Sequence, residues 1–150
     1  MTVTQELYDL GVQVRSKSES RLMRTIGWVL GLLGISFTER FWTTISGKII
    51  WAPTTANLDN LEGYAVTLRH EMTHIRQARD YPVWFQLSYL LLPLPFLFAY
   101  GRWHWERQAY LVDIRAGRPV EDIVQSLWRN YLFTWPKPWM RAWFAKRGLR

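Results

Sequence analysis

Two histidines four residues apart, with a glutamate directly after the first, are the residues of this chain best suited to chemistry. They lie in the pentapeptide His70-Glu71-Met72-Thr73-His74. On a helix, four residues turn the chain by about 400°, so His70 and His74 share one face and both imidazoles can bind one ion. Glu71 lies on the flank of that face, within reach of a water bound to the ion. The pattern predicts half of a zinc site with a general base beside it.

The sequence around this pentapeptide predicts the helix that the geometry requires. Apolar residues recur there at steps of three and four positions: Leu61, Ala65, Leu68, Met72 and Ile75. Asn57, Asp59 or Asn60 can cap the start of the helix, and Pro82 stops it. We therefore expect a helix over about residues 60–80.

A third metal ligand has to come from further along the chain. The candidates are His104, Glu106, Asp113 and the pair Glu121-Asp122. Glu106, which opens the segment Glu106-Arg107-Gln108-Ala109-Tyr110, is the best of them, and His104 is its main rival. Residues two apart on a helix point about 200° away from each other, so Glu106 and His104 cannot both face the ion. With His104, the site would have three histidine ligands.

With these two motifs the chain resembles the gluzincins, the thermolysin-like clan of zinc metallopeptidases, and in particular its shortest members, the minigluzincins. The resemblance covers the two motifs and the chain between and just before them, about residues 41–113. In that clan a glutamate on the helix after the H-E-x-x-H helix completes the metal shell. The resemblance implies that His70, His74 and Glu106 bind Zn²⁺, and that Glu71 is the general base and later the proton donor.

One position departs from the clan pattern. Many gluzincins carry an aspartate four residues after the glutamate ligand, where it orients the first histidine, and this chain has Tyr110 there. Tyr110, or Asp113 one turn further along, could take over that role. Tyr110, Tyr131 and His104 are the candidates for a donor to the oxyanion.

A β-hairpin is predicted just before the metal-binding helix. Residues 41–45 and 48–51 are rich in threonine, isoleucine and aromatic side chains, and Ser46-Gly47 separates them. The resemblance implies an edge strand here that pairs with an extended peptide substrate, formed by Lys48, Ile49, Ile50 and Trp51. A purely structural hairpin is the alternative.

Length and composition favour a single domain of the α+β class, mainly α-helical. We expect N-terminal helices over residues 1–36, the hairpin over 37–53, a two-helix zinc core over 60–116 and C-terminal helices over 119–150. The chain of 150 residues contains no cysteine, which excludes disulfides and thiolate ligands. A transition metal would then be held by imidazole and carboxylate groups.

The N-terminal third predicts two helices. The first covers residues 4–14, and the second follows the polar link at residues 16–20 and ends near Leu33. The apolar part of the second helix carries Gly27 and Gly31 in a G-x-x-x-G pattern. It spans about ten residues, too few to cross a bilayer, so we expect a buried or interface helix.

An uncharged run of twenty residues, 82–101, separates the two metal-binding motifs. Its length would allow one membrane crossing. Gln86, Ser88, Pro93 and Pro95 argue against it, and we expect a helix ending near Leu92 and then a packed or membrane-dipping loop. Glu106 would then return to a helix beside the zinc site.

The C-terminal section combines charge with aromatic side chains. Gly117 is expected to stop one helix, and Pro119 to lie in the first turn of the next. Beyond residue 135 an apolar stripe accompanies basic residues: Trp139, Met140, Trp143 and Phe144, with Arg141, Lys146, Arg147 and Arg150. This basic tail would dock on an anionic membrane surface or a partner protein, or pack back on the domain.

These observations favour a zinc-dependent metallohydrolase, a small peptidase that cleaves peptide bonds through a metal-bound water with Glu71 as the base. The alternative is a non-catalytic, zinc-stabilised scaffold that uses its basic, tryptophan-rich surface. Nucleic-acid binding rests only on the net charge of +7 and the aromatic content, and ranks last. The start of the chain shows no signal peptide, which predicts a cytoplasmic or membrane-peripheral protein; a virion or release by lysis would also fit.

Overall fold

The computed structural model describes residues 1–32, 34–90, 98–130 and 136–149. The chain divides into two compact units, residues 1–80 and 81–150. The boundary between them falls between the two helices of the predicted zinc core.

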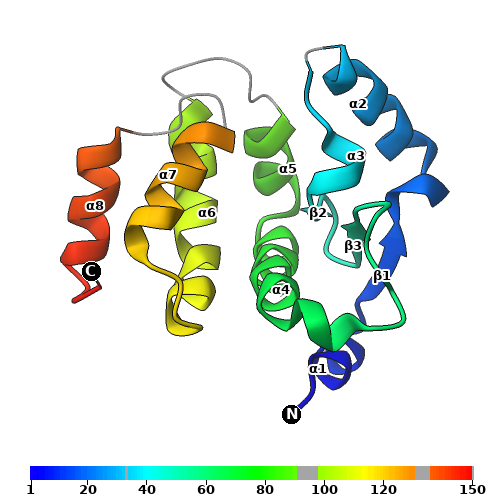
Figure 1. Ribbon diagram of the computed structural model, residues 1–150, viewed down its shortest axis with the longest axis horizontal. Helices are drawn as coiled ribbons and strands as arrows, with labels where there is room; N and C mark the ends of the chain where they lie inside the picture. Colours follow the sequence, from blue (N-terminus) through cyan, green and yellow to red (C-terminus); the bar gives the residue numbers. More distant parts are fainter. Residues whose placement is uncertain (33, 91–97, 131–135, 150) are drawn as a thin grey trace. The chain divides into compact units, whose positions relative to one another are not determined.

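Unit 1 combines helices with a small sheet (Figure 1). Its elements are α1 (Val3–Asp9), β1 (Gln13–Ser16), η1 (Lys17–Glu19), α2 (Arg21–Gly31), α3 (Phe37–Arg40), β2 (Thr43–Thr44), β3 (Ile49–Ala52), η2 (Leu61–Tyr64) and α4 (Ala65–Asp80). The predicted helix over residues 60–80 is confirmed as η2 followed by α4. The side chain of Asn60 caps η2 by accepting a hydrogen bond from the Gly63 amide at 3.2 Å.

The sheet has the strand order β1-β3-β2. The predicted hairpin is confirmed, because β2 pairs with β3 in antiparallel fashion, with Thr44 opposite Ile50. On its other side β3 pairs in parallel with β1, with Val14 opposite Ile50. The predicted edge strand of Lys48, Ile49, Ile50 and Trp51 is therefore wrong: Ile49, Ile50 and Trp51 lie in the central strand, and the Lys48 carbonyl already accepts from the Gln13 amide.

The strand β1 replaces the end of a predicted helix. Residues 4–14 were expected to be helical throughout, but α1 ends at Asp9. Gly11 adopts a φ of +59°, and its amide and that of Val12 satisfy the carbonyls of Tyr8 and Leu7. This left-handed turn ends the helix and directs the chain into β1.

The core of unit 1 lies between α1, the sheet and the apolar face of α4. Its buried side chains are Val3, Leu7, Val12, Ile50, Leu68, Met72 and Ile75. Polar contacts fasten α4 near both ends: the Arg69 guanidinium binds both Glu6 oxygens at 2.7–3.2 Å, and Arg79 donates to the carbonyls of Gly47 and Leu10 at 2.7 Å. A Cβ at Gly47 would overlap the Arg79 side chain, so this turn requires glycine.

Helix α2 packs on one side only. A Cβ at Gly27 would overlap the Thr38 side chain, which confirms a close helix contact at this glycine, and Met23 is buried. The opposite side of the helix is exposed at Leu22, Trp28, Val29 and Leu32. Of the two alternatives expected for this helix, buried or interface, full burial is therefore wrong, because α3 covers only the Gly27 face, and an interface role stays a prediction.

Unit 2 is helical in its described residues: α5 (Pro82–Leu90), α6 (Phe98–Arg115), α7 (Val120–Asn130) and α8 (Lys137–Ala145). Gly117, at φ +97°, ends α6 as expected, with hydrogen bonds from its own amide to Ile114 and from the Arg118 amide to Asp113. No helix among the described residues has both the length and the apolar character needed to cross a membrane. The proline turn expected at Pro93 and Pro95 lies outside the described residues.

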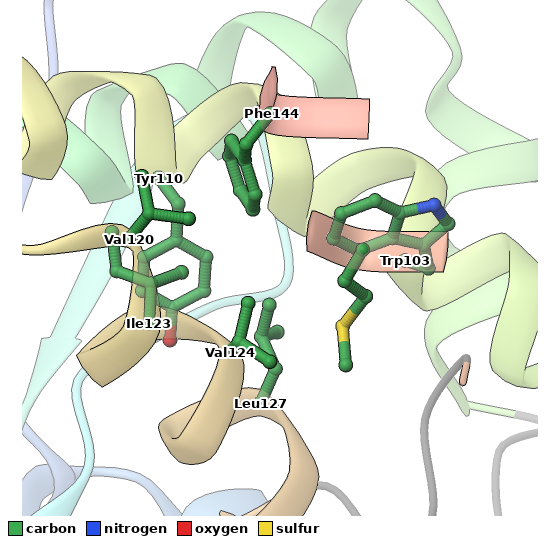
Figure 2. Close-up of a cluster of buried hydrophobic side chains, with 8 residues drawn as sticks. Trp103, Tyr110, Val120, Ile123, Val124, Leu127 and Phe144 are labelled. Atoms are coloured by element: carbon green, nitrogen blue, oxygen red, sulfur yellow. The ribbon is translucent and has the colours of Figure 1, made fainter. Parts of the chain in front are cut away.

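The apolar core of unit 2 is built from α6, α7 and α8 (Figure 2). Its buried members are Trp103, Tyr110, Val120, Ile123, Val124, Leu127, Met140 and Phe144. The apolar stripe of the C-terminal tail therefore packs within its own unit through Met140 and Phe144, whereas Trp139 is exposed.

Candidate metal centre

His70 and His74 lie on α4 one turn apart, as the motif predicts. Their side chains are buried, with exposed fractions of 8% for His70 and 2% for His74. The ring centroids are 5.1 Å apart and the ring planes meet at 72°. The two imidazoles thus form a buried, closely spaced pair on one helix face.

Gln77 orients the second imidazole. Its Oε1 lies 2.8 Å from Nδ1 of His74, and both side chains are buried. An amide oxygen can only accept, so the ring carries a proton on Nδ1, and in the neutral imidazole the lone pair is then on Nε2. This is the tautomer in which a histidine binds a metal through Nε2. Gln77 was not among the predicted residues, although its place one turn after His74 on the same helix was a usable signal.

Glu71 is held by a residue of the sheet. The Thr44 hydroxyl, on β2, donates a 2.7 Å hydrogen bond to Oε2 of Glu71, and both side chains are buried. This hydrogen bond joins the hairpin to α4, and both strands of the hairpin also pack against α4. The carboxylate beside the two histidines therefore has a defined orientation. Sequence reasoning missed Thr44, because its partner is 27 residues away and only the docking of the hairpin brings them together.

A buried lysine adds positive charge near Glu71. Lys17 is 0% exposed, and its ammonium donates to the carbonyls of Phe37 at 3.0 Å and Phe41 at 2.6 Å. The ammonium also lies 3.7 Å from the centre of the Phe37 ring. Burial lowers the pKa of Lys17 to about 8, and the negative charge of Glu71 opposes that shift. Residues 16–20 were expected to be a polar link, so the burial of Lys17 was not predicted from the sequence.

Four of the predicted site residues belong to α6 in unit 2: His104, Glu106, Tyr110 and Asp113. Glu106 is 0% exposed. Asp113 is buried too, and one of its oxygens accepts a 3.4 Å hydrogen bond from Arg118. Tyr110 packs its ring into the apolar core beside Val120 and Ile123 (Figure 2). The side chain in the position of the clan's aspartate thus contributes to packing.

His104 has surroundings that differ from those of Glu106. Its side chain is only partly buried, and Nδ1 lies 2.9 Å from an Arg107 guanidinium nitrogen, which can only donate. Burial first, and the Arg107 charge second, lower the pKa of His104. Within unit 2, Glu106 is therefore the more deeply buried of the two rival ligands.

The remaining ligand candidates, Glu121 and Asp122, lie at exposed positions of α7. Glu121 is exposed and binds Arg141 at 2.8 Å, as expected of a surface ion pair. Tyr131, a candidate oxyanion donor, lies outside the described residues. Within unit 1, then, the structure brings together His70, Glu71 and His74, and it adds Thr44 and Gln77 as their partners.

In chemical terms, unit 1 offers two buried imidazoles on one helix face and a buried carboxylate on the flank of that face. Imidazole nitrogen is a preferred ligand of zinc and related transition metals, and a third, carboxylate ligand would complete a protein shell with an open position. Comparisons with protein-family models, with curated proteins and with solved structures give no match to this chain.

Proposed function

We propose that this protein is a zinc-dependent metallohydrolase, a small peptidase in which His70, His74 and Glu106 hold the metal and Glu71 is the general base. The observation that carries the proposal is the arrangement on α4. Two buried imidazoles share a face one turn apart, and a buried carboxylate lies beside them with its own hydrogen-bond partner.

The donor set suits zinc. The chain has no cysteine, so the ligands must be imidazole and carboxylate. His70, His74 and Glu106 are each buried side chains of that kind, and in this proposal they bind the same ion. Gln77 fixes the tautomer in which His74 offers Nε2. The resemblance to the gluzincins points to the same three residues.

Bound zinc would supply a Lewis acid that lowers the pKa of water toward neutrality and polarises a carbonyl group. In this proposal Glu71 removes the proton of the attacking water and then donates it to the leaving nitrogen of the peptide. The Thr44 hydroxyl donates to Oε2 of Glu71, so in this proposal Oε1 is the oxygen that takes part in the proton transfer. A peptide that pairs with the sheet would have to use β1 or β2, because both sides of β3 are taken.

Metal content tests the ligand set. The experiment is elemental analysis of the purified protein beside His74→Ala and Glu106→Ala, with Glu121→Ala as an exposed acidic control in unit 2. We expect one zinc per chain in the wild type and in the control, and loss of the metal in both ligand variants. Full zinc retention in Glu106→Ala would show that Glu106 is not a ligand, and His104 or Asp113 would then be the candidate for the third ligand.

Turnover tests the catalytic step. Glu71→Gln keeps the size of the side chain and removes its ability to take a proton, so we expect unchanged zinc content and a loss of peptide cleavage of about 10²–10⁴-fold. The assay is cleavage of a library of quenched fluorescent peptides, with Glu62→Gln as a control on the neighbouring η2. A variant that cleaves as fast as the wild type would contradict the role of Glu71.

A second candidate is a scaffold in which zinc stabilises the fold without turnover. The observation that favours it is Tyr110, whose ring lies in the apolar core at the position where the clan carries an orienting aspartate. A scaffold would bind zinc and be stabilised by it, would cleave none of the peptides, and would keep its biological activity in Glu71→Gln. The two candidates therefore differ in the response to this one substitution.

A further inference from the structure

Helix α2 carries an exposed apolar face. The four large side chains on it are Leu22, Trp28, Val29 and Leu32. Trp28 and Leu32 are one turn apart and are 68% and 69% exposed. Leu22 and Val29 are seven residues apart, so they also share a side of the helix. A tryptophan and three aliphatic side chains on one side of α2 are thus exposed to water, and we call this set the stripe.

The helix is held in place from its other side. Met23 is buried, and Gly27 lies against the Thr38 side chain of α3. The exposed stripe is therefore on the side of α2 that faces away from its packing contacts. Since α2 is fixed to the unit, the stripe is presented as a rigid surface.

Positive charge accompanies the stripe. Arg21 and Arg24, in the first turns of α2, are both exposed. The sequence contains no acidic residue between Glu19 and Glu39, so nothing within the helix offsets the two guanidinium groups. Tryptophan and aliphatic side chains beside arginines are the combination found in helices that lie in the headgroup layer of an anionic bilayer.

The length of α2 limits the mode of binding. Its eleven residues extend over about 16 Å, roughly half of the thickness of the hydrocarbon core. A helix of this length can lie in the plane of the interface but cannot cross it. Its exposed stripe would then enter the boundary between headgroups and acyl chains.

We propose that α2 docks the protein on the surface of an anionic phospholipid membrane. Trp28 and Leu32 insert among the headgroups, and Arg21 and Arg24 bind lipid phosphates. The charge of the partner follows from the two arginines, and its apolar layer follows from the stripe. The proposal does not depend on the metal centre.

Vesicle binding of the whole protein tests the apolar part. Sucrose-loaded vesicles of phosphatidylcholine, with or without phosphatidylglycerol, are sedimented with the wild type and with Trp28→Ala/Leu32→Ala. We expect the wild type to bind the anionic vesicles and the variant to bind them about tenfold more weakly. The matched control is Trp84→Ala on α5, because Trp84 is also 68% exposed. It should bind like the wild type.

Charge is tested in the same assay with Arg21→Gln/Arg24→Gln. Because each basic side chain near an anionic surface contributes to binding, we expect this variant to bind the anionic vesicles about thirtyfold more weakly. The control that removes the same charge elsewhere is Arg115→Gln/Lys146→Gln, at exposed positions of unit 2. The proposal requires the α2 variant to lose clearly more than this control.

Several results would overturn the proposal. One is equal binding to neutral and anionic vesicles, and another is no binding to either. A loss in Trp139→Ala as large as that in the α2 variant would assign docking to the C-terminal tail, where Trp139 is 59% exposed. Self-association that Trp28→Ala/Leu32→Ala abolishes, measured by light scattering without vesicle binding, would show that a second copy covers the stripe.

Discussion

The two units of this protein bury different kinds of side chain. In unit 1, α4 and its neighbours bury a set of polar groups: Lys17, Thr44, His70, Glu71, His74 and Gln77. In unit 2, the core is aromatic and aliphatic around Trp103, and the buried charged groups among its described residues are Glu106 and Asp113 on α6. Buried polar groups cost free energy unless they are hydrogen-bonded, whereas buried aromatic rings stabilise the fold directly.

The two kinds of burial connect function and stability in different ways. Unit 2 should lose stability when a large ring is removed. Unit 1 contains polar contacts, such as that between Thr44 and Glu71, whose loss affects the site as well as the fold.

Removal of the largest core side chain in unit 2 should have the greatest effect. Trp103 is 1% exposed and contacts the rings of Trp143 and Phe144, with centroids at 5.7 and 5.8 Å. We expect Trp103→Ala to lower the free energy of unfolding by about 3–5 kcal/mol, measured by urea denaturation. Trp139→Ala, at an exposed position, is the control. A loss below 1 kcal/mol would show that this core is not the main source of stability in unit 2.

The buried ammonium of Lys17 should appear in the pH dependence of stability. Its pKa is about 8 in the folded protein, against 10.5 ordinarily, so between these values the unfolded chain binds a proton that the folded chain lacks. The free energy of unfolding should therefore rise with pH across this window, by up to about 3 kcal/mol. Denaturation at several pH values is compared between the wild type and Lys17→Met, which lacks this contribution. Parallel pH profiles would contradict the low pKa.

The contact between Thr44 and Glu71 should have an intermediate effect. Thr44→Val removes the donor of a buried 2.7 Å hydrogen bond to a carboxylate. We expect a loss of about 1–3 kcal/mol in the free energy of unfolding, because the buried carboxylate loses its partner. Thr44→Ser keeps the hydroxyl and should retain most of the wild-type free energy of unfolding. In the background of Glu71→Gln the loss should be smaller, and an unchanged loss would mean that the two side chains are not coupled.

The surface pair between Arg141 and Glu121 should have the smallest effect. Its nitrogen–oxygen distance is 2.8 Å, and the pair holds the pKa of Glu121 at about 2, but both side chains are about half exposed. Solvent and salt screen such pairs. We expect Arg141→Ala to leave the melting temperature within the error of the measurement, at low and at high salt. A large shift at low salt only would show that this pair fixes α8.

Local features of unit 1 were predictable from the sequence. The helix that carries His70 and His74 follows from the apolar spacing, and its cap at Asn60 and its end before Pro82 from short-range signals. The hairpin turn at Gly47 is equally local. In each case the interaction that decides the structure joins residues close in sequence.

The features that were missed depend on distant parts of the chain. The pairing of Val14 with Ile50 turned a predicted edge strand into the central one, and no local pattern reveals a parallel partner 36 positions away. The partner of Glu71, Thr44, depends in the same way on how the hairpin docks. Gln77 differs, since it follows His74 on the same helix and could have been found. The sequence thus contains the metal-binding pattern itself but not the contacts that hold it.

The guanidinium of Arg79, near the end of α4, binds the hairpin turn at Gly47 and the end of α1 at Leu10. Near the other end of α4, Arg69 binds Glu6. Together these bonds oppose any rotation of α4 about its own axis, because a turn of the helix would pull on two neighbouring elements at once. The direction in which His70 and His74 point is therefore governed in part by two arginines that lie outside the site, and an insertion in the turn before β3 would misalign both rings.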